Sequence, residues 1–240
     1  MHNYYGTTDK GGREKNEDWI SSFETGETLF LIMLDGFGIE DDNDTKILMP
    51  EITNKIEDFI KKFYMQGFDI TTIMNQGIYL ANVIMQENRK KEEYKKCGAS
   101  ITICGIYNNV LYISNAGINR VYLLRENNIF QGTKDNNEAQ VLLDNNQITQ
   151  EEYETHPKRN VVTEGLGKDN INIFNSSVNL QSEDIVVMLT DGIYRALGDE
   201  VVKNVVIDSG DIKKACEWLI EGSNEFKSPD NLSAIVSYIK

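Results

Sequence analysis

Two Asp-Gly steps in the sequence follow its most continuous apolar runs. Asp35-Gly36 comes directly after residues 29–34, and a second step, Asp191-Gly192, follows a run of the same construction. Each step would place a carboxylate at the end of a buried strand, where glycine permits a tight turn and close backbone approach. A single Asp-Gly step usually marks only a turn, but two of them after the two most buried runs favour a shared site.

Two further acidic segments extend this set. Asn16-Glu17-Asp18 lies near the N-terminus, and Asp230-Asn231 precedes the last apolar run. Mg²⁺ and Mn²⁺ prefer oxygen ligands, and two such ions about 3.5 to 4 Å apart need a bridging carboxylate and can activate water for attack on phosphorus. The spacing alone does not show that the segments converge, so ordinary strand-end or solvated aspartates remain the alternative.

The apolar pattern predicts the elements that must position these carboxylates. In chain order they are a strand at 29–34, a helix opening at Pro50 and stopping at Gly67, a helix at 70–85, a hairpin of 100–107 and 110–115 turning at Asn108-Asn109, a hairpin of 120–125 and 129–130 turning at Asn127-Asn128, a helix at 149–155, a strand at 185–189, a helix at 211–220 stopped by Gly222, and a strand at 233–239. Hairpin-linked strands with paired helices predict an α+β fold in which helices cover antiparallel sheets.

Composition narrows the class of protein. The 240 residues suit one large domain, and the net charge of −14 repels nucleic acid and anionic lipid surfaces. Cys97, Cys104 and Cys216 are odd in number and form no C-x-x-C pair, which indicates a reducing, cytoplasmic location. We expect no membrane association, because no run approaches the ~18 to 20 apolar residues that cross a bilayer and the first residues resemble no secretory signal.

Seven motifs, taken in order, resemble those of the metal-dependent serine/threonine protein phosphatases of type 2C (the PPM family) in their short bacterial form. They are GGREKNED at 11–18, DGFG at 35–38, GAS at 98–100, NAGINR at 115–120, ITQEE with HPKRN and LG between 148 and 167, TDG at 190–192, and DNLS at 230–233. The resemblance covers nearly the whole chain. It implies one catalytic domain over residues 1–240, a four-layer αββα sandwich of two antiparallel sheets flanked by helix pairs, and a flap segment at about 134–160.

The resemblance also implies a ligand set for two Mn²⁺ or Mg²⁺ ions. Asp35 would bridge both ions, and the carbonyl of Gly36 would bind one of them. Asp191 and Asp230 would bind the other ion. Asp18 would act beside the pair through water.

Other residues would support the reaction around these ligands. Arg13 would hold the substrate phosphate, because a planar guanidinium meets phosphate oxygens with two hydrogen bonds. Glu17 and Asn231 adjoin the ligands in sequence and would act from behind them. His156 could serve as a general acid, but His-Pro matches a structural motif beside the flap, and we favour that structural interpretation.

One departure from the family pattern affects the number of ions. Ile118 stands where the family carries an aspartate that helps Asp191 hold a third, weaker metal. Isoleucine cannot ligate a metal, so the third site is in doubt and turnover could be reduced. Phe37 stands where animal members of the family carry a histidine, which bacterial members commonly lack.

The sequence therefore predicts an enzyme that hydrolyses phosphoserine and phosphothreonine in proteins with water activated by two metal ions. Its expected partners are phosphorylated proteins, including a serine/threonine kinase and its substrates, and we expect a monomer. The alternative is a pseudophosphatase that binds phosphoproteins or regulates them, which Ile118 favours and the complete aspartate set opposes. A nucleotide phosphodiesterase is a distant third possibility, because the acidic chain has no basic patch.

Overall fold

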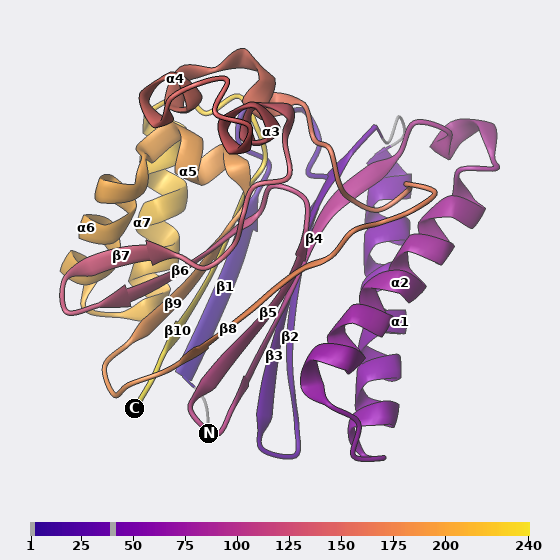
Figure 1. Cartoon of the computed structure of the whole chain (residues 1–240), viewed down its shortest axis with the longest axis horizontal. Helices are drawn as coiled ribbons and strands as arrows, with labels where there is room; N and C mark the ends of the chain where they lie inside the picture. Colours follow the sequence, from indigo (N-terminus) through magenta and orange to yellow (C-terminus); the bar gives the residue numbers. More distant parts are fainter. Residues whose placement is uncertain (1–2, 39–41) are drawn as a thin grey trace.

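Two five-stranded antiparallel sheets face each other in the centre of the molecule (Figure 1). The structure is a computed structural model that describes residues 3–38 and 42–240. The first sheet has the strand order β1 (Asn3–Asp9), β10 (Leu232–Tyr238), β9 (Ile185–Leu189), β6 (Arg120–Arg125) and β7 (Asn128–Gln131). The second has the order β2 (Asp18–Thr25), β3 (Thr28–Phe37), β4 (Gly98–Tyr107), β5 (Val110–Ala116) and β8 (Phe174–Asn179).

Helices form the two outer layers. The second sheet is covered by α1 (Asp42–Tyr64) and α2 (Ile70–Asn88), and the first sheet by α5 (Asp191–Leu197), α6 (Asp199–Ser209) and α7 (Ile212–Glu225). The 3-10 helix η1 (Glu92–Tyr94) precedes β4, whereas α3 (Glu138–Asp144), α4 (Gln150–Thr155) and the 3-10 helix η2 (Pro157–Asn160) lie in the connection from β7 to β8. The predicted four-layer αββα sandwich is confirmed.

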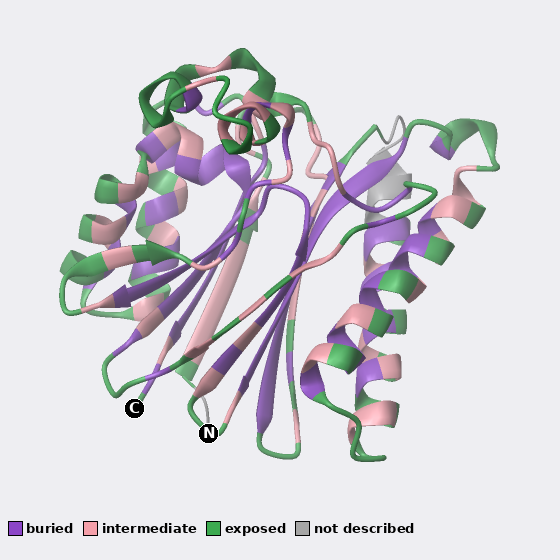
Figure 2. Ribbon diagram, viewed as in Figure 1, coloured by how far each residue is buried: buried purple, intermediate pink, exposed green. Residues whose placement is uncertain are grey.

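The strand β3 shows why its sequence is apolar at every position. Leu29, Leu31 and Met33 face the other sheet and belong to the core between the sheets. Phe30 and Leu34 point the opposite way and pack in the core beneath α1 and α2. A strand covered on both faces has no polar side, so the usual alternation disappears. Figure 2 shows the same result as buried central strands, with exposure on the outer helix faces, the loops and the edge strands β7 and β8.

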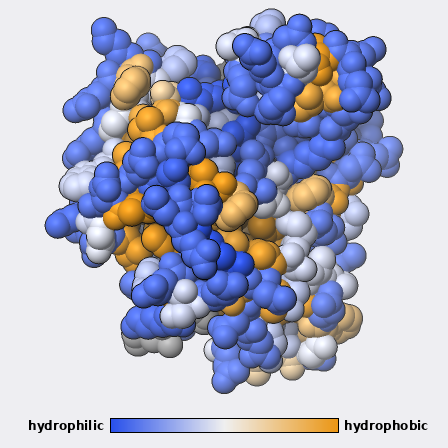
Figure 3. Space-filling view, turned by 60° about the vertical axis from the view of Figure 1, so that its left-hand side comes forward, coloured by the Kyte–Doolittle hydropathy of each residue, from blue (hydrophilic) through white to orange (hydrophobic). Residues whose placement is uncertain are grey.

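The face of the molecule shown in Figure 3 is mainly hydrophilic, as the charge of the chain predicts. On the face shown in Figure 3, hydrophobic side chains form limited patches among hydrophilic ones. Of the helices in the described part of the chain, none combines the length and apolar character needed to cross a bilayer.

The expected start of the first long helix at Pro50 is wrong. α1 begins at Asp42 and carries Pro50 in its interior. Leu48 and Met49, on the N-terminal side of the proline, are buried like Ile52 beyond it. The helix therefore continues through Pro50 because packing of this apolar stripe outweighs the roughly 3 kcal/mol that an interior proline costs.

Two other boundaries also differ from the prediction. The second hairpin turns at Glu126-Asn127, with φ of 48° and 66°, and Arg125 pairs with Asn128. This strand register places the turn one residue earlier than the Asn127-Asn128 step predicted. α7 runs past Gly222 to Glu225, because one glycine costs only about 1 kcal/mol in a helix that is packed on the first sheet. The hairpin at Asn108-Asn109 is confirmed, with φ of 47° and 55°.

Candidate active site

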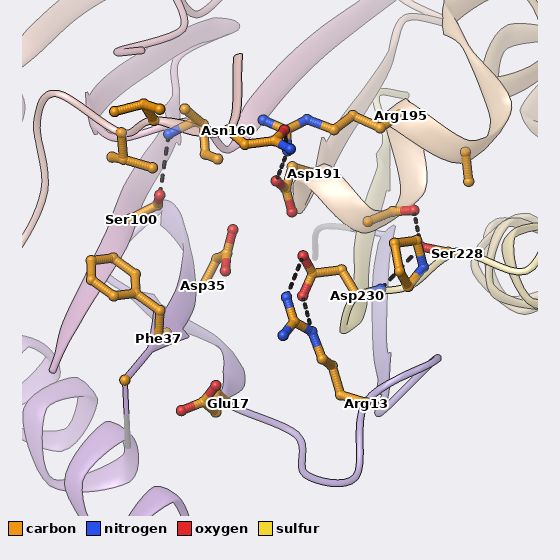
Figure 4. Close-up of a pocket in the computed structure, with 18 of the residues that line it drawn as sticks. Arg13, Glu17, Asp35, Phe37, Ser100, Asn160, Asp191, Arg195, Ser228 and Asp230 are labelled. Carbon is orange, nitrogen blue, oxygen red and sulfur yellow. Dashed lines mark hydrogen bonds and ion pairs between the residues drawn. The ribbon is translucent and has the colours of Figure 1, made fainter. Parts of the chain in front are cut away.

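A cavity of about 770 Å³ lies at one end of the sandwich, where β3 and β9 end. Its lining comes from segments that are far apart in the sequence. Figure 4 shows the carboxylates of Asp35, Asp191 and Asp230 directed toward the middle of the cavity, with Arg13 and Arg195 on opposite sides in this view. Three of the aspartates singled out in the sequence thus line the same cavity.

The second sheet places two of the predicted residues side by side. Asp18 on β2 is the register partner of Asp35 on β3, and Asp35 is in turn the partner of Ser100 on β4. Directly opposed residues in antiparallel strands project on the same face with Cβ atoms about 4.5 to 5.5 Å apart. The strand register therefore brings the Asp18 and Asp35 carboxylates together.

Asp18 is a buried carboxylate that joins the two sheets. Its Oδ2 atom accepts hydrogen bonds from Thr190 Oγ1 at 3.0 Å and from Ser233 Oγ at 2.8 Å, whereas Oδ1 is buried without a hydrogen-bond partner among the residues that the structure describes. Burial raises the pKa of Asp18 to about 7; the hydrogen bonds from the two hydroxyl groups lower this pKa, and the charges of nearby Asp191 and Asp230 raise it. The site thus contains a desolvated carboxylate oxygen that no described side chain or amide contacts by a hydrogen bond.

The charges of the other carboxylates add to the effect of burial. Burial raises the pKa of Asp35 well above its usual value, and the charges of Asp191, Asp18 and Asp230 raise it further. Asp191, at the start of α5, also has its pKa raised by burial, and Arg195 opposes that rise. Three desolvated carboxylates with Asp230 beside them attract cations strongly.

Two arginines supply part of the compensating charge. Arg13 donates from Nε to Asp230 Oδ1 at 3.0 Å and from Nη2 to Oδ2 at 3.1 Å. Arg195 Nη1 lies 2.6 Å from Asp191 Oδ2. Each of these aspartates is therefore turned toward a guanidinium, as Figure 4 shows.

The residues fit hard divalent cations by their chemistry. The donors are oxygen atoms only, as Mg²⁺ and Mn²⁺ prefer, and Asp18 Oδ1 is a buried carboxylate oxygen with no hydrogen-bond partner within residues 3–38 and 42–240. No three Asp, Glu, His or Cys side chains in the described part of the chain already surround a single point. Asp191 and Asp230 are each paired with an arginine instead.

Gly36 and Asn231 shape the loop that carries Arg13. A Cβ atom on Gly36 would lie 2.6 Å from the carbonyl oxygen of Glu17, so only glycine fits there. Asn231 accepts from the Glu17 amide at 2.9 Å and donates to the carbonyls of Lys10 and Lys15 at 2.8 and 2.6 Å. Glu17 itself lines the cavity.

Ile118 lies at the cavity and His156 does not. Ile118 is 4% exposed and is part of the lining. Its amide donates to Ser100 Oγ at 3.2 Å, and its carbonyl accepts from Tyr194 Oη at 2.8 Å. His156 is outside the lining, where its Nδ1 accepts from the Lys158 amide at 3.2 Å at the start of η2.

Arg195 was not predicted as a site residue, and neither were the hydroxyls of Thr190 and Ser233 that hold Asp18. Asp191 and Arg195 are spaced i,i+4, the spacing of an ion pair on one helix face. This spacing is informative only once the helix α5 is known, and α5, with seven residues, has too few residues to show an apolar period in the sequence. The hydroxyl contacts join residues 172 and 215 positions apart and have no local signal.

Comparison with known proteins identifies relatives of this chain. No protein-family model matches it. Protein phosphatase PhpP of Streptococcus pneumoniae is 27% identical over 176 residues, which cover 70% of this chain and 72% of that protein. The putative protein phosphatase 2C-type of Streptococcus pyogenes is 21% identical over 223 residues, which cover 92% of this chain and 90% of that protein.

Solved structures agree with these sequence relatives. The serine/threonine phosphatase of S. agalactiae superposes with a TM-score of 0.89 at 22% identity and covers 100% of both chains. The catalytic domain of the phosphatase PstP in complex with two manganese ions superposes with a TM-score of 0.81 at 21% identity, covering 100% of this chain and 99% of that one. The resemblance inferred from the seven motifs is confirmed: the chain is similar in sequence to bacterial protein phosphatases, one of them of type 2C, and it has the fold of bacterial serine/threonine phosphatases.

Proposed function

We propose that this protein hydrolyses phosphoserine and phosphothreonine in proteins, releasing inorganic phosphate and the free hydroxyl, with two Mn²⁺ or Mg²⁺ ions. The observation that carries the proposal is the cavity itself. It gathers Asp35, Asp191 and Asp230 from separate segments, with the buried carboxylate of Asp18 behind them and Arg13 at the wall. The relatives named as protein phosphatases support the same reaction.

The aspartates would hold the ions. Asp35 would bridge them, the Gly36 carbonyl would complete one site, and Asp191 with Asp230 would form the other. Asp18 would act from beside the pair. When bound, two divalent cations offset the charge of the phosphate and lower the pKa of a water molecule. The donor chemistry and the unpaired oxygen of Asp18 support this assignment.

Arg13 would bind the phosphate of the substrate. Its side chain is 56% exposed at the cavity, so a substrate can reach the guanidinium. It presents two parallel donors, which Asp230 uses in the structure and which phosphate oxygens match equally well. Arg13 thereby orients the phosphorus for attack, and no nucleophilic side chain is needed.

The rim of the cavity supports a protein substrate over a small phosphate ester. Phe37, Val161 and Phe226 line it and are 45%, 43% and 66% exposed. Exposed apolar side chains around a charged centre suit a polypeptide chain that carries one phosphorylated residue. Phosphorylated proteins, including a serine/threonine kinase and its substrates, are thus the proposed signalling partners.

The proposed location is the cytoplasm. The three cysteines are free and buried, which suits a reducing compartment. Protein kinases and their substrates would meet the enzyme there.

A pseudophosphatase is the less favoured function. Ile118 removes one potential ligand, but Arg13, Asp18, Asp35, Asp191 and Asp230 all remain around the cavity or directly behind it. A module that only bound phosphoproteins would not need buried carboxylates, since they repel the phosphate.

Removal of divalent cations is expected to abolish hydrolysis. EDTA-treated protein should not release phosphate from a phosphothreonine peptide or from a small aryl phosphate, and Mn²⁺ or Mg²⁺ should restore both activities. The reason is that the carboxylates of the site repel the substrate until cations neutralise them. Full activity of the metal-free protein would contradict the two-metal proposal, whereas phosphopeptide binding without turnover at any metal concentration would favour the pseudophosphatase.

Restoring a carboxylate as Ile118→Asp is expected to create a weak additional cation site beside Asp191. If the missing ligand limits turnover, the variant should be faster at high Mn²⁺ and show a new low-affinity phase in its metal titration. Because Ile118 is buried, an unpaired aspartate would also lower the free energy of unfolding by about 1 to 3 kcal/mol without metal.

Melting temperature and rate, measured together over a series of Mn²⁺ concentrations, separate these two effects. Ile118→Asn is the matched control, because it adds a polar group of similar size without charge. A folded Ile118→Asp variant with the wild-type rate and no new metal phase would show that this loop does not contribute to cation binding.

A further inference from the structure

Arg195 contacts three residues at the wall of the cavity. Its Nη1 atom lies 2.6 Å from Asp191 Oδ2 and also donates to Asn160 Oδ1 at 2.6 Å. Its Nη2 atom donates to the carbonyl of Arg159 at 2.7 Å. One guanidinium thus joins a carboxylate at the start of α5 to the last turn of η2, as Figure 4 shows for Asp191 and Asn160.

The pair lies away from bulk solvent. The side chains of Arg195 and Asp191 are 22% and 8% exposed. Arg195 Nε is buried without a hydrogen-bond partner among the described residues. A buried ion pair gains its strength from low screening, and it loses that strength if either partner is neutralised by another ion.

The charge of Arg195 reaches beyond Asp191. It lowers the pKa of Asp35, against the larger effects of burial and of the neighbouring carboxylates. Arg195 is thus electrostatically close to two of the aspartates that would bind cations. Arg13 stands on the other side of the cavity and is paired with Asp230, so Arg195 is a second internal cation of the site.

We propose that Arg195 is a built-in counter-ion of Asp191 that competes with divalent cations for this carboxylate and couples their binding to release of Pro157–Asn160 at the cavity wall. The inference rests on the proposed function, because it takes Asp191 as a cation ligand. Arg195 is then a positioning residue: without divalent cations it neutralises Asp191 and holds η2, and with them both contacts weaken together.

The sign of the effect on metal affinity follows from charge. A guanidinium and a divalent cation that share one carboxylate repel each other, and at an effective dielectric constant of about 20 this repulsion is sufficient for an effect of about tenfold on the binding constant. Removing the positive charge should therefore tighten cation binding by about tenfold. If Arg195 instead oriented Asp191 for the ion, its removal would weaken binding.

The test compares three variants of the full chain by Mn²⁺ titration in a calorimeter. Arg195→Gln removes the charge and retains a hydrogen-bond donor for η2, while Arg195→Lys retains the charge. Arg125→Gln is the matched control, because Arg125 forms an ion pair with Asp184 at 2.6 Å and is not part of the cavity lining. We expect a dissociation constant about tenfold lower for Arg195→Gln, and values close to wild type for the other two variants.

A second measurement needs no variant. Trypsin cleaves after Lys158 and Arg159, so the rate of cleavage at these bonds reports whether η2 is held. In the wild type this rate should rise as Mn²⁺ saturates the site, with cleavage followed by mass spectrometry. Cleavage elsewhere in the chain serves as the internal reference.

The outcomes separate the inference from the proposed function. Unchanged or weaker Mn²⁺ binding in a folded Arg195→Gln variant, or cleavage at η2 that ignores Mn²⁺, overturns the counter-ion role while leaving the phosphatase intact. Absence of Mn²⁺ binding in the wild type and in Arg125→Gln overturns the two-metal site, and the inference fails with it.

Discussion

Replacing Asp35 by asparagine is expected to lower kcat/KM toward a phosphothreonine peptide by about a thousandfold or more. Asp35 has the central place among the carboxylates: it is opposite Asp18 in the strand register and lines the cavity with Asp191. Asparagine has nearly the same shape but cannot carry the negative charge that a bridge between two cations needs. The loss should appear mainly in kcat, measured at saturating Mn²⁺.

Thermal melting gives an independent measure for the same variant. Mn²⁺ should raise the melting temperature of the wild type, because the ion binds only the folded state and relieves repulsion among carboxylates. Little gain is expected for Asp35→Asn. Asp58→Asn, on the exposed side of α1, makes the same change in charge and should behave as wild type in both assays. Equal gains with Mn²⁺ in wild type and Asp35→Asn would show that the ion binds elsewhere.

The largest expected loss of stability comes from Asp135→Asn, at about 3 to 5 kcal/mol. Asp135 is 2% exposed and accepts from Arg120 Nε at 3.0 Å and Nη2 at 2.9 Å, and from Tyr153 Oη at 2.6 Å. These contacts fasten the connection between β7 and β8 to β6. Without the carboxylate, the buried Arg120 charge keeps only its longer ion pair with the exposed side chain of Asp199, at 3.3 Å. The free energy of unfolding, from urea titration, measures the loss.

The dependence of stability on pH tests whether the negative charge of Asp135 is the cause of this loss. Burial raises the pKa of Asp135, but hydrogen bonds from Arg120 and the charge of Arg120 outweigh it, so the folded pKa lies below the usual value. A carboxylate whose pKa is lowered in the folded state stabilises the fold at pH values above its unfolded pKa, near 3.8. This stabilisation is lost as the pH falls through the pKa of the folded state. Asp135→Asn should therefore lose its difference from wild type at strongly acidic pH.

Asp144→Asn is the matched control in the same connection. Its ion pair with Lys134, at 2.7 Å, has both side chains more than 40% exposed, so its removal should cost at most about 1 kcal/mol. A similarly small loss for Asp135→Asn would mean that water reaches Arg120 and that the connection is held by its apolar contacts.

The helices and strands that could be predicted are those long enough to show a local sequence pattern. The strands β3 and β9 are apolar at successive positions because both faces are buried, and that signal is visible in the sequence. The turn at Asn108-Asn109 needs two residues with positive φ, which asparagine tolerates, so its place was also readable. The predicted helix start at Pro50 was wrong, because the packing of buried residues on both sides of the proline outweighs its local cost in the helix.

The strand β2 and the helix α5 were not predicted, and both carry site residues. β2 has mostly half-exposed positions, so no strong apolar alternation marks it, and its pairing with β3 places Asp18 against Asp35. α5 spans seven residues, and its ion pair between Asp191 and Arg195 becomes meaningful only once that helix exists. Pairing and packing between distant segments produced these elements.

The residues that could bind cations were identified from residue type and motif order, because both are local properties and the Asp-Gly steps stand at the ends of apolar strands. Whether these residues meet depends on the fold. Asp18 reaches Ser233 across 215 positions, and Asp230 reaches Arg13 across 217. Such contacts depend on strand register and sheet stacking, which sum many weak interactions along the chain. The pairing of Asp191 with Arg195, and so the charge that cations would meet there, is a property of the folded cavity.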